Sequence, residues 1–171
     1  MRSSASSTGS AEPASRVEDA ATAARNNDVD RLCELLNAGV PVDATDERGY
    51  ALVMLAAYSG AVDTTHLLLE RGADPDAADP AGNTPLMGVS FKGHVGVAEA
   101  LLDQGASIDA ANESGTTALM TAVLFGQTEV VDWLLDVGAD PSRTDEDGLT
   151  AADIARRKGH VDLVDRLETA R

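Results

Sequence analysis

The sequence predicts an all-α repeat fold, a solenoid built from helix–turn–helix units. Two observations support this prediction. Each unit contains two stretches of helical pattern, and a fixed period between about 20 and 50 residues is typical of repeat architectures. Such repeats build an extended binding surface rather than an enclosed reaction chamber. The period is 33 residues and appears in three glycine series: Gly49, Gly82, Gly115 and Gly148; Gly60, Gly93, Gly126 and Gly159; Gly72, Gly105 and Gly138.

The period divides the chain into five units. The second to fifth units begin at the Asp or Asn three residues before a first-series glycine, and they cover 46–78, 79–111, 112–144 and 145–171. An irregular first unit, 16–45, is expected to contain helices near 17–25 and 29–37. Residues 1–15 are rich in Ser, Gly and Ala, so we expect a disordered tail there.

The third unit shows why each element forms. Thr84 is a good N-cap, and Pro85 at the first helical position loses no N–H that the helix needs. Leu86 and Val89 then share one helix face. Gly93 ends this helix because glycine adopts the left-handed cap conformation readily.

The second helix of the third unit follows after Gly93. It is expected to place Val95, Ala98, Leu101 and Leu102 inward and to stop at Gly105. An extended turn then leads into the next unit.

The last unit replaces apolar residues with charged ones. Arg156 and Arg157 stand where other units have Ser90-Phe91 and Val123-Leu124, and Glu168 stands at a position that is Leu elsewhere. Terminal repeats need a polar outer face. We therefore expect the two end units to be caps and the array to be a complete domain.

The composition limits the classes of partner. Hydrophobic residues make up 43% of the chain but aromatic residues only 3%, so the core is expected to be aliphatic. The net charge of −16 argues against nucleic acid and against anionic membranes. An acidic field favours a basic partner, although it also serves solubility alone. A high-salt cytoplasm and a GC-rich genome both remain possible origins of the acidic bias.

The single cysteine, Cys33, indicates a reducing cytoplasm, since no disulfide can form within the chain. Cys33 lies among Leu32, Leu35 and Leu36 and is expected to be a small buried hydrophobic residue. No run of 18 apolar residues and no secretory signal are present, so a cytoplasmic location is expected.

Short motifs resemble the ankyrin repeat family. They are Thr84-Pro85-Leu86, Gly93-His94, Gly72-Ala73-Asp74-Pro75 with its repeat at Gly138-Ala139-Asp140-Pro141, and the leucine pairs Leu68-Leu69, Leu101-Leu102 and Leu134-Leu135. The resemblance covers about residues 16 to 171. It implies helix–turn–helix units with β-turn finger loops, stacked into a curved right-handed solenoid. It also implies protein–protein binding by the fingers and by the concave helix face.

A narrower resemblance lies in the middle repeats. Residues 52–60 and 84–94 are similar to those of small bacterial ankyrin proteins, some of which accompany catalases, although Ala61 replaces a histidine of that pattern. It implies an alternative function, an accessory or stress-related factor that supports an enzyme such as catalase.

The family resemblance locates candidate partner-binding residues. The two residues before each second-series glycine should line the concave groove, and a residue next to a first-series glycine should lie on a finger. Both Tyr and both Phe of the chain fall at such positions, and aromatic residues are enriched at binding hot spots. The alternative is that the rings pack between adjacent first helices. The candidates are Tyr50, Tyr58, Ser59, Phe91, Lys92, Leu124 and Phe125.

Acidic finger residues are a second set of candidates. A ladder of carboxylates could hold a basic segment, whereas the alternative is a solvated edge. The candidates are Glu47, Asp79, Glu113, Glu146 and Asp147.

The residues give no pattern of enzyme chemistry. His94 and His160 stand two repeats apart, too far to share a metal ion, and 145–148 lack the ligand spacing of a calcium loop. No nucleotide-binding loop, catalytic triad or zinc-protease motif occurs. We therefore predict a non-enzymatic module without metal, cofactor or small-molecule substrate. It would bind an unidentified protein partner and be a monomer.

Overall fold

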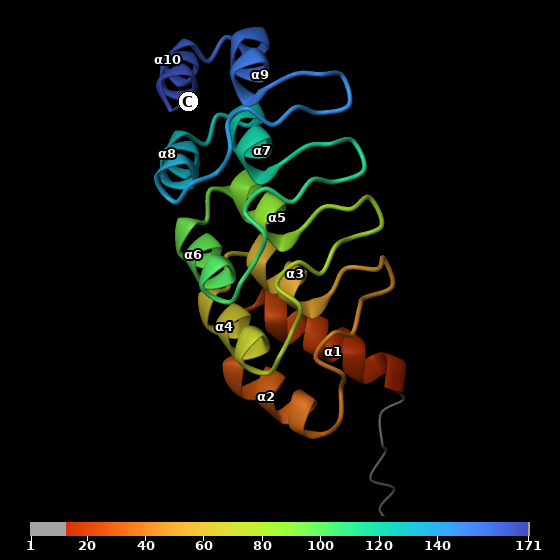
Figure 1. Cartoon of the computed structure of the whole chain (residues 1–171). Helices are drawn as coiled ribbons and strands as arrows, with labels where there is room; N and C mark the ends of the chain where they lie inside the picture. The colour runs from red at the N-terminus through yellow and green to blue at the C-terminus, as the bar shows by residue number, and fades with distance from the viewer. Residues whose placement is uncertain (1–12, 171) are drawn as a thin grey trace, which may run out of the picture.

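The computed structural model describes residues 13–170, in which ten helices form five antiparallel pairs (Figure 1). The 33-residue period of the sequence is visible as a regular series of helix pairs and finger loops. The helices are α1 (Pro13–Arg25), α2 (Val29–Asn37), α3 (Leu52–Tyr58), α4 (Val62–Glu70), α5 (Pro85–Lys92), α6 (Val95–Asp103), α7 (Ala118–Leu124), α8 (Thr128–Asp136), α9 (Ala151–Lys158) and α10 (Val161–Thr169).

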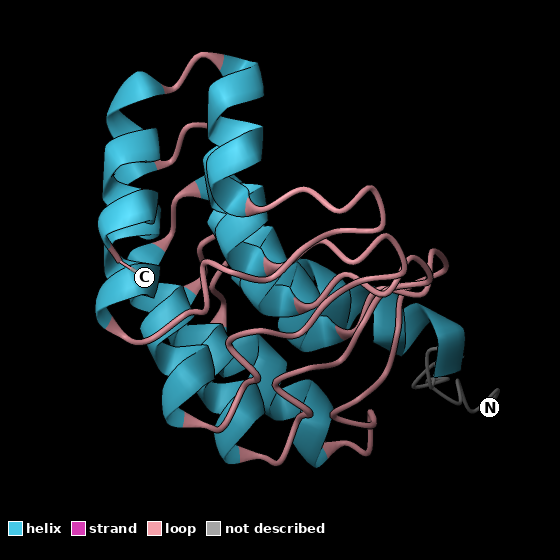
Figure 2. Ribbon diagram, turned by 45° about the horizontal axis from the view of Figure 1, so that its top comes forward, coloured by secondary structure: helices cyan, strands magenta, loops and turns pink. Residues whose placement is uncertain are grey.

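The odd-numbered helices form one layer and the even-numbered helices a second layer beside it (Figures 1 and 2). Between successive pairs, a finger loop projects away from both layers (Figure 1). This is the all-α repeat architecture that the 33-residue period predicted. Among residues 13–170, no helix combines the length and the apolar character needed to cross a membrane.

The core lies between the two layers and is aliphatic, as the composition predicted. Each of the three middle units contributes a leucine from its first helix and one from its second, and these are at most 1% exposed. Burying one leucine side chain contributes roughly 1.5–3 kcal/mol, so the stacked leucines are a large part of what holds the units together. They are Leu52, Leu86 and Leu119 in the first helices and Leu68, Leu101 and Leu134 in the second.

Three details differ from the sequence prediction. Helix α1 begins at Pro13, not near residue 17, because proline suits the first helical position. The expected tail boundary at residue 15 is therefore too late, and residues 1–12 lie outside the described residues. In α6, Val97 and Ala100 are buried together with Ala98 and Leu101. Val95 and Leu102 are only half-buried, because the inward face is rotated toward positions 97 and 100.

The third difference concerns Cys33, which is half-buried and not part of the core. Leu32 and Leu35 occupy the inward face of α2, which leaves Cys33 at its edge. There the Arg71 guanidinium donates to the Cys33 Sγ over 3.1 Å, and the side-chain amide of Asn37 donates over 3.6 Å.

The last unit carries charged side chains on α9 and α10. Arg156 and Arg157 are exposed on α9. Arg156 donates to Asp153 over 2.8 Å and also pairs with Glu168 of α10. Ionic contacts thus occupy the surface where the inner units have apolar residues.

Candidate functional site

A groove of about 800 Å³ runs along the first helices and the bases of the fingers, from α1 to α7. The first helices supply the floor and one wall, and the finger bases supply the other wall. Of the predicted partner-binding residues, Lys92 is not part of the lining. The predicted residues that do line the groove are Tyr50, Tyr58, Ser59, Phe91, Leu124 and Phe125.

Three aromatic rings form a continuous row across the groove. Tyr58 and Phe91 are stacked with ring centroids 5.9 Å apart, and Phe125 meets Phe91 edge-on at 4.3 Å. Aromatic pairs in these geometries contribute roughly 0.5–1.5 kcal/mol beyond their buried area. The interpretation that the rings pack between adjacent first helices is therefore correct as far as ring–ring contacts go.

The same rings also remain open to solvent. Tyr58 is 45% exposed and Phe125 is 50% exposed, while Phe91 between them is half-buried. Exposed aromatic residues that line one groove form an apolar patch, and such patches mark interaction sites more often than isolated apolar residues do. The ring–ring packing fixes the rings in place and leaves area for a partner.

Lys92 lies beside the aromatic row. Its Nζ stands 4.7 Å from the ring centroid of Tyr58 and 5.4 Å from that of Phe91. A cation over an aromatic face is attracted by the ring quadrupole, by roughly 0.5–1 kcal/mol at an exposed site. The aromatic row therefore has a positive charge at its edge.

Tyr50 belongs to the groove wall and not to the finger tip. It is half-buried and packs against the core. Its N–H donates to the Asp46 Oδ1 over 3.0 Å, which fixes the end of the finger next to α3.

One acidic finger candidate, Asp79, has a structural role. Its Oδ1 accepts from the N–H groups of Ala81 and Asn83, each over 2.9 Å, and so closes the finger turn. Asp46, Asn112 and Asp145 close the other fingers in the same way. The remaining candidates are exposed and lie outside the groove lining: Glu47, Glu113, Glu146 and Asp147.

A second acidic series joins neighbouring units. Asp43 accepts from the N–H of Asp74 over 3.2 Å, and Asp109 accepts from that of Asp140 over 2.9 Å. Asp76 accepts from both the N–H and the hydroxyl of Ser107, over 3.0 Å and 2.6 Å. These three carboxylates, which recur at one position of the repeat, satisfy backbone donors of the following unit.

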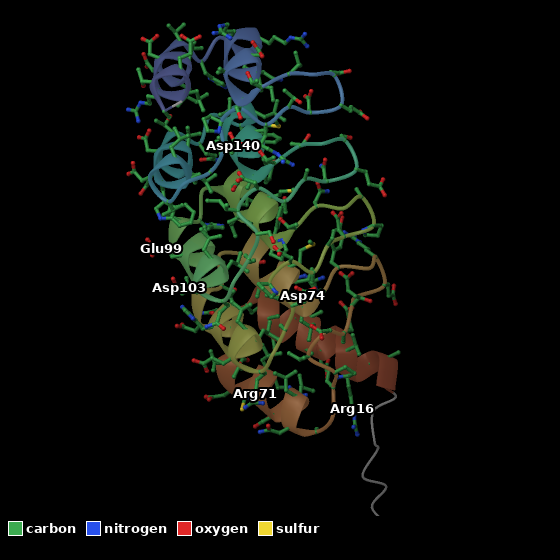
Figure 3. The ribbon with its side chains drawn as sticks, viewed as in Figure 1. Arg16, Arg71, Asp74, Glu99, Asp103 and Asp140 are labelled. Carbon is green, nitrogen blue, oxygen red and sulfur yellow. The ribbon has the colours of Figure 1, made fainter. Side chains whose placement is uncertain are left out.

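Other acids lie on the outer face of the second helices. Glu99 and Asp103 project from α6 on the side away from the fingers (Figure 3). At one repeat position of these helices stand four more exposed acids, Asp30, Asp63, Glu129 and Asp162. Negative charge therefore recurs along the layer of second helices.

Sequence reasoning missed several groove residues. Arg25 of α1 donates to the Asp46 carboxylate over 2.8 Å, and only 5% of the Asp46 side chain is exposed. Arg48, Met54 and Met87 also line the groove. The Arg25–Asp46 pair joins positions 21 residues apart in two different units, and no sequence pattern indicates that contact. The two methionines stand 33 residues apart, and that spacing could have placed them together.

The groups whose pKa departs from its ordinary value lie in a loop, at a helix cap and in a contact between second helices. The pKa of Asp140 is below its ordinary value because the hydroxyl and N–H of Ser142 donate to its carboxylate. The pKa of Asp153 is lowered mainly by donation from Thr150, with Arg156 a smaller cause. The pKa of Arg166 is raised by Asp132. These groups belong to finger loops, a helix cap and the α8–α10 contact.

The histidines pack on glycines of neighbouring units. A Cβ added to Gly60 would lie 2.8 Å from the His94 ring, and one added to Gly126 would lie 3.2 Å from the His160 ring. His94 and His160 therefore stand over the turns of the preceding units. Within residues 13–170, no group of three or more His, Cys, Asp or Glu is placed to hold a metal ion.

Comparison with known families agrees with this geometry. A family model described as "Ankyrin repeats (3 copies)" matches residues 21–112, and one described as "Ankyrin repeats (many copies)" matches residues 101–155. The chain belongs to the ankyrin repeat family. A search of curated proteins finds no match to the chain, so nothing supports the narrower likeness to catalase-associated proteins. Ankyrin repeats are in general protein–protein interaction modules and are typically non-enzymatic.

Proposed function

We propose that this ankyrin repeat protein is a non-enzymatic module that binds a protein partner along the groove, with the exposed finger residues as secondary contacts. The observation that carries the proposal is the row Tyr58–Phe91–Phe125, whose rings line the groove and keep exposed area. Large rigid aromatic side chains give much contact area for little loss of conformational entropy. Ser59 and Leu124 flank the row and extend the contact area.

A stiff stack of repeats suits this role. The groove is formed by helices whose positions are fixed by the buried leucines and by the Asp43, Asp76 and Asp109 contacts between units. A preformed surface spends little ordering entropy when it binds. We propose that the protein acts as a monomer in a reducing cytoplasm, which the single cysteine favours.

The proposal is tested by capture of partners from the source cells with a carboxylate-reactive cross-linker, followed by mass spectrometry. The chain has only two lysines, Lys92 and Lys158, so a lysine-reactive linker would report on few sites. We expect the double variant Tyr58→Asp and Phe91→Asp to lose the captured partner, because charge on the row removes its apolar contact.

The matched control is Val161→Asp on α10. Val161 is 71% exposed and does not line the groove, so the control adds charge to an exposed apolar position elsewhere. Circular dichroism checks that all variants stay folded. Capture that survives in the folded double variant would show that the groove is not the binding surface.

A further inference from the structure

Gly88, in the middle of α5, lines the groove without a side chain, and we call the space this leaves the hollow at Gly88. The other units carry Leu55, Thr121 and Ile154 at this repeat position. A helix is less stable with glycine than with alanine in its interior, because glycine loses more backbone freedom on folding. Gly88 is therefore unfavourable for the helix in which it lies.

Nothing in the packing requires a glycine at this position. A Cβ added to Gly88 would meet only Tyr58 Cδ2, at 3.5 Å, which is an ordinary van der Waals contact. Gly88 also lacks the positive φ that the turn glycines have. The fold thus accepts alanine here, and what the missing side chain provides is depth in the groove beside Tyr58 and Phe91.

The charged groups around the hollow do not share the strongly negative balance of the whole chain. Arg25 is paired with Asp46, and the Asp79 carboxylate accepts three donors of its own finger. Arg48 lines the groove and Lys92 lies at its edge, and within residues 13–170 neither has a carboxylate within 4.0 Å. The groove therefore has two cations without an ionic partner beside the hydrogen-bonded Asp79 carboxylate, although the net charge of the chain is −16.

Lys92 follows Gly88 by one helical turn. Residues four apart on a helix lie on one face, with Cβ positions roughly 5–6 Å apart. The Lys92 ammonium is held over the rings of Tyr58 and Phe91, and the Tyr58 ring borders the hollow. An apolar hollow and a cation thus stand side by side at a fixed spacing.

We infer that the groove recognises a partner segment in which an aliphatic side chain is followed closely by an Asp or Glu. The aliphatic side chain enters the hollow at Gly88, and the carboxylate pairs with Lys92, with Arg48 as a second cation in the groove. The inference rests on the proposed function, because it names the chemistry of the partner at the same groove. It excludes a Lys- or Arg-rich segment as the occupant, despite the acidic net charge.

The test uses a phage-displayed library of random 16-residue peptides, selected on the immobilised full chain. We expect the selected peptides to share an aliphatic residue with an Asp or Glu within a few positions. A synthetic peptide of the selected sequence is then measured against variants by calorimetry. Gly88→Ala should weaken its binding about tenfold, because an added methyl group takes up part of the hollow, while the midpoint of thermal unfolding rises by about 2 °C.

Gly96→Ala is the matched control. Gly96 lies in α6, outside the groove, and an added Cβ meets nothing within 4 Å. This variant should leave peptide binding unchanged. A Gly88→Ala protein that is more stable and yet binds more weakly separates a role in recognition from a role in the fold.

The carboxylate is tested by exchanging charges. Lys92→Glu should weaken the peptide about tenfold, and a peptide whose acidic residue is replaced by Lys should regain affinity for that variant. Groove-dependent peptides that tolerate both Gly88→Ala and Lys92→Glu, or that are rich in Lys and Arg, would overturn the inference and leave the proposed function standing. If no selected peptide loses binding when Tyr58 and Phe91 are replaced by Asp, that result would contradict both the inference and the proposed function.

Discussion

The contact between Gly60 and His94 gives the sharpest prediction for the fold. Gly60 has φ +72° in the left-handed region, and a Cβ added there would lie 2.8 Å from Cε1 of His94. Gly159 occupies the same repeat position in the last unit with φ +76°, and an added Cβ would meet nothing within 4 Å. The two glycines share a backbone conformation and differ in their neighbours.

The loss in the free energy of unfolding that each alanine substitution causes follows from this difference. A left-handed conformation costs an L-residue about 1–2 kcal/mol, so Gly159→Ala should lower the free energy of unfolding by that amount. Gly60→Ala should lose this amount and a further 1–3 kcal/mol, roughly, because the added carbon overlaps the imidazole ring. Urea unfolding monitored by circular dichroism measures both losses.

A double-mutant cycle tests the origin of the extra loss. In the His94→Ala background the ring is gone, so Gly60→Ala should cost about the same as Gly159→Ala. The coupling between Gly60→Ala and His94→Ala should then be about 1–3 kcal/mol. Equal losses for the two glycine variants, or a coupling near zero, would refute the argument that the histidine ring defines this turn.

Three further predictions concern carboxylates, and unfolding in urea checks each of them. Asp76→Ala should lower the free energy of unfolding by about 1 kcal/mol, because it removes hydrogen bonds to exposed donors of the next unit that water can then satisfy; the exposed Asp103→Ala should change it by less than about 0.5 kcal/mol, and equal losses would contradict this role. Arg25→Ala should lose about 2–3 kcal/mol, since a buried carboxylate is left unpaired; a loss typical of a surface pair would contradict that reasoning. Asp153 has a pKa lowered in the fold by Thr150, so its contribution is present above about pH 4 and is lost as the pH falls through its folded pKa. The stability difference between wild type and Asp153→Asn should therefore shrink below pH 4, and a constant difference would contradict this.

The fold could be predicted because particular residue types mark where its helices begin and end. Thr84 caps α5 by accepting from the Met87 N–H, and Gly93 ends the same helix with φ +87°. Both follow from the local chemistry of Thr and Gly. The inward face of α6 was less predictable, because Val95, Val97, Leu101 and Leu102 are all apolar and only packing decides which of them are buried.

The groove could be predicted only in part. The positions of Tyr58, Phe91 and Phe125 follow from the repeat and the family resemblance, and the structure places them in one row. That they line a groove does not test whether a partner binds there, which stays a prediction. The hollow at Gly88 is a missing side chain, and it becomes visible only when neighbouring atoms show that alanine would fit.

The acidic residues divide into groups with different roles, which net charge alone does not reveal. Asp43, Asp76 and Asp109 accept from backbone donors of the following unit, and Asp79 with its equivalents closes the fingers. These carboxylates serve the stack, so they are not available to bind a partner. Other exposed acids lie on the finger loops and on the second helices, outside the groove lining, such as Glu47, Glu113, Glu99 and Asp103.

Because the acids divide in this way, the salt dependence of partner binding indicates which surface the partner contacts. Interactions between exposed charges are screened beyond roughly 8–10 Å at physiological ionic strength. A partner held by the finger tips or the outer face would therefore dissociate as salt is added, because exposed carboxylates supply its attraction. A partner anchored on the aromatic row and in the hollow at Gly88 is held mainly by apolar contact, which salt does not weaken. Binding that persists at high salt would thus indicate the groove, and the acidic surface would then serve solubility.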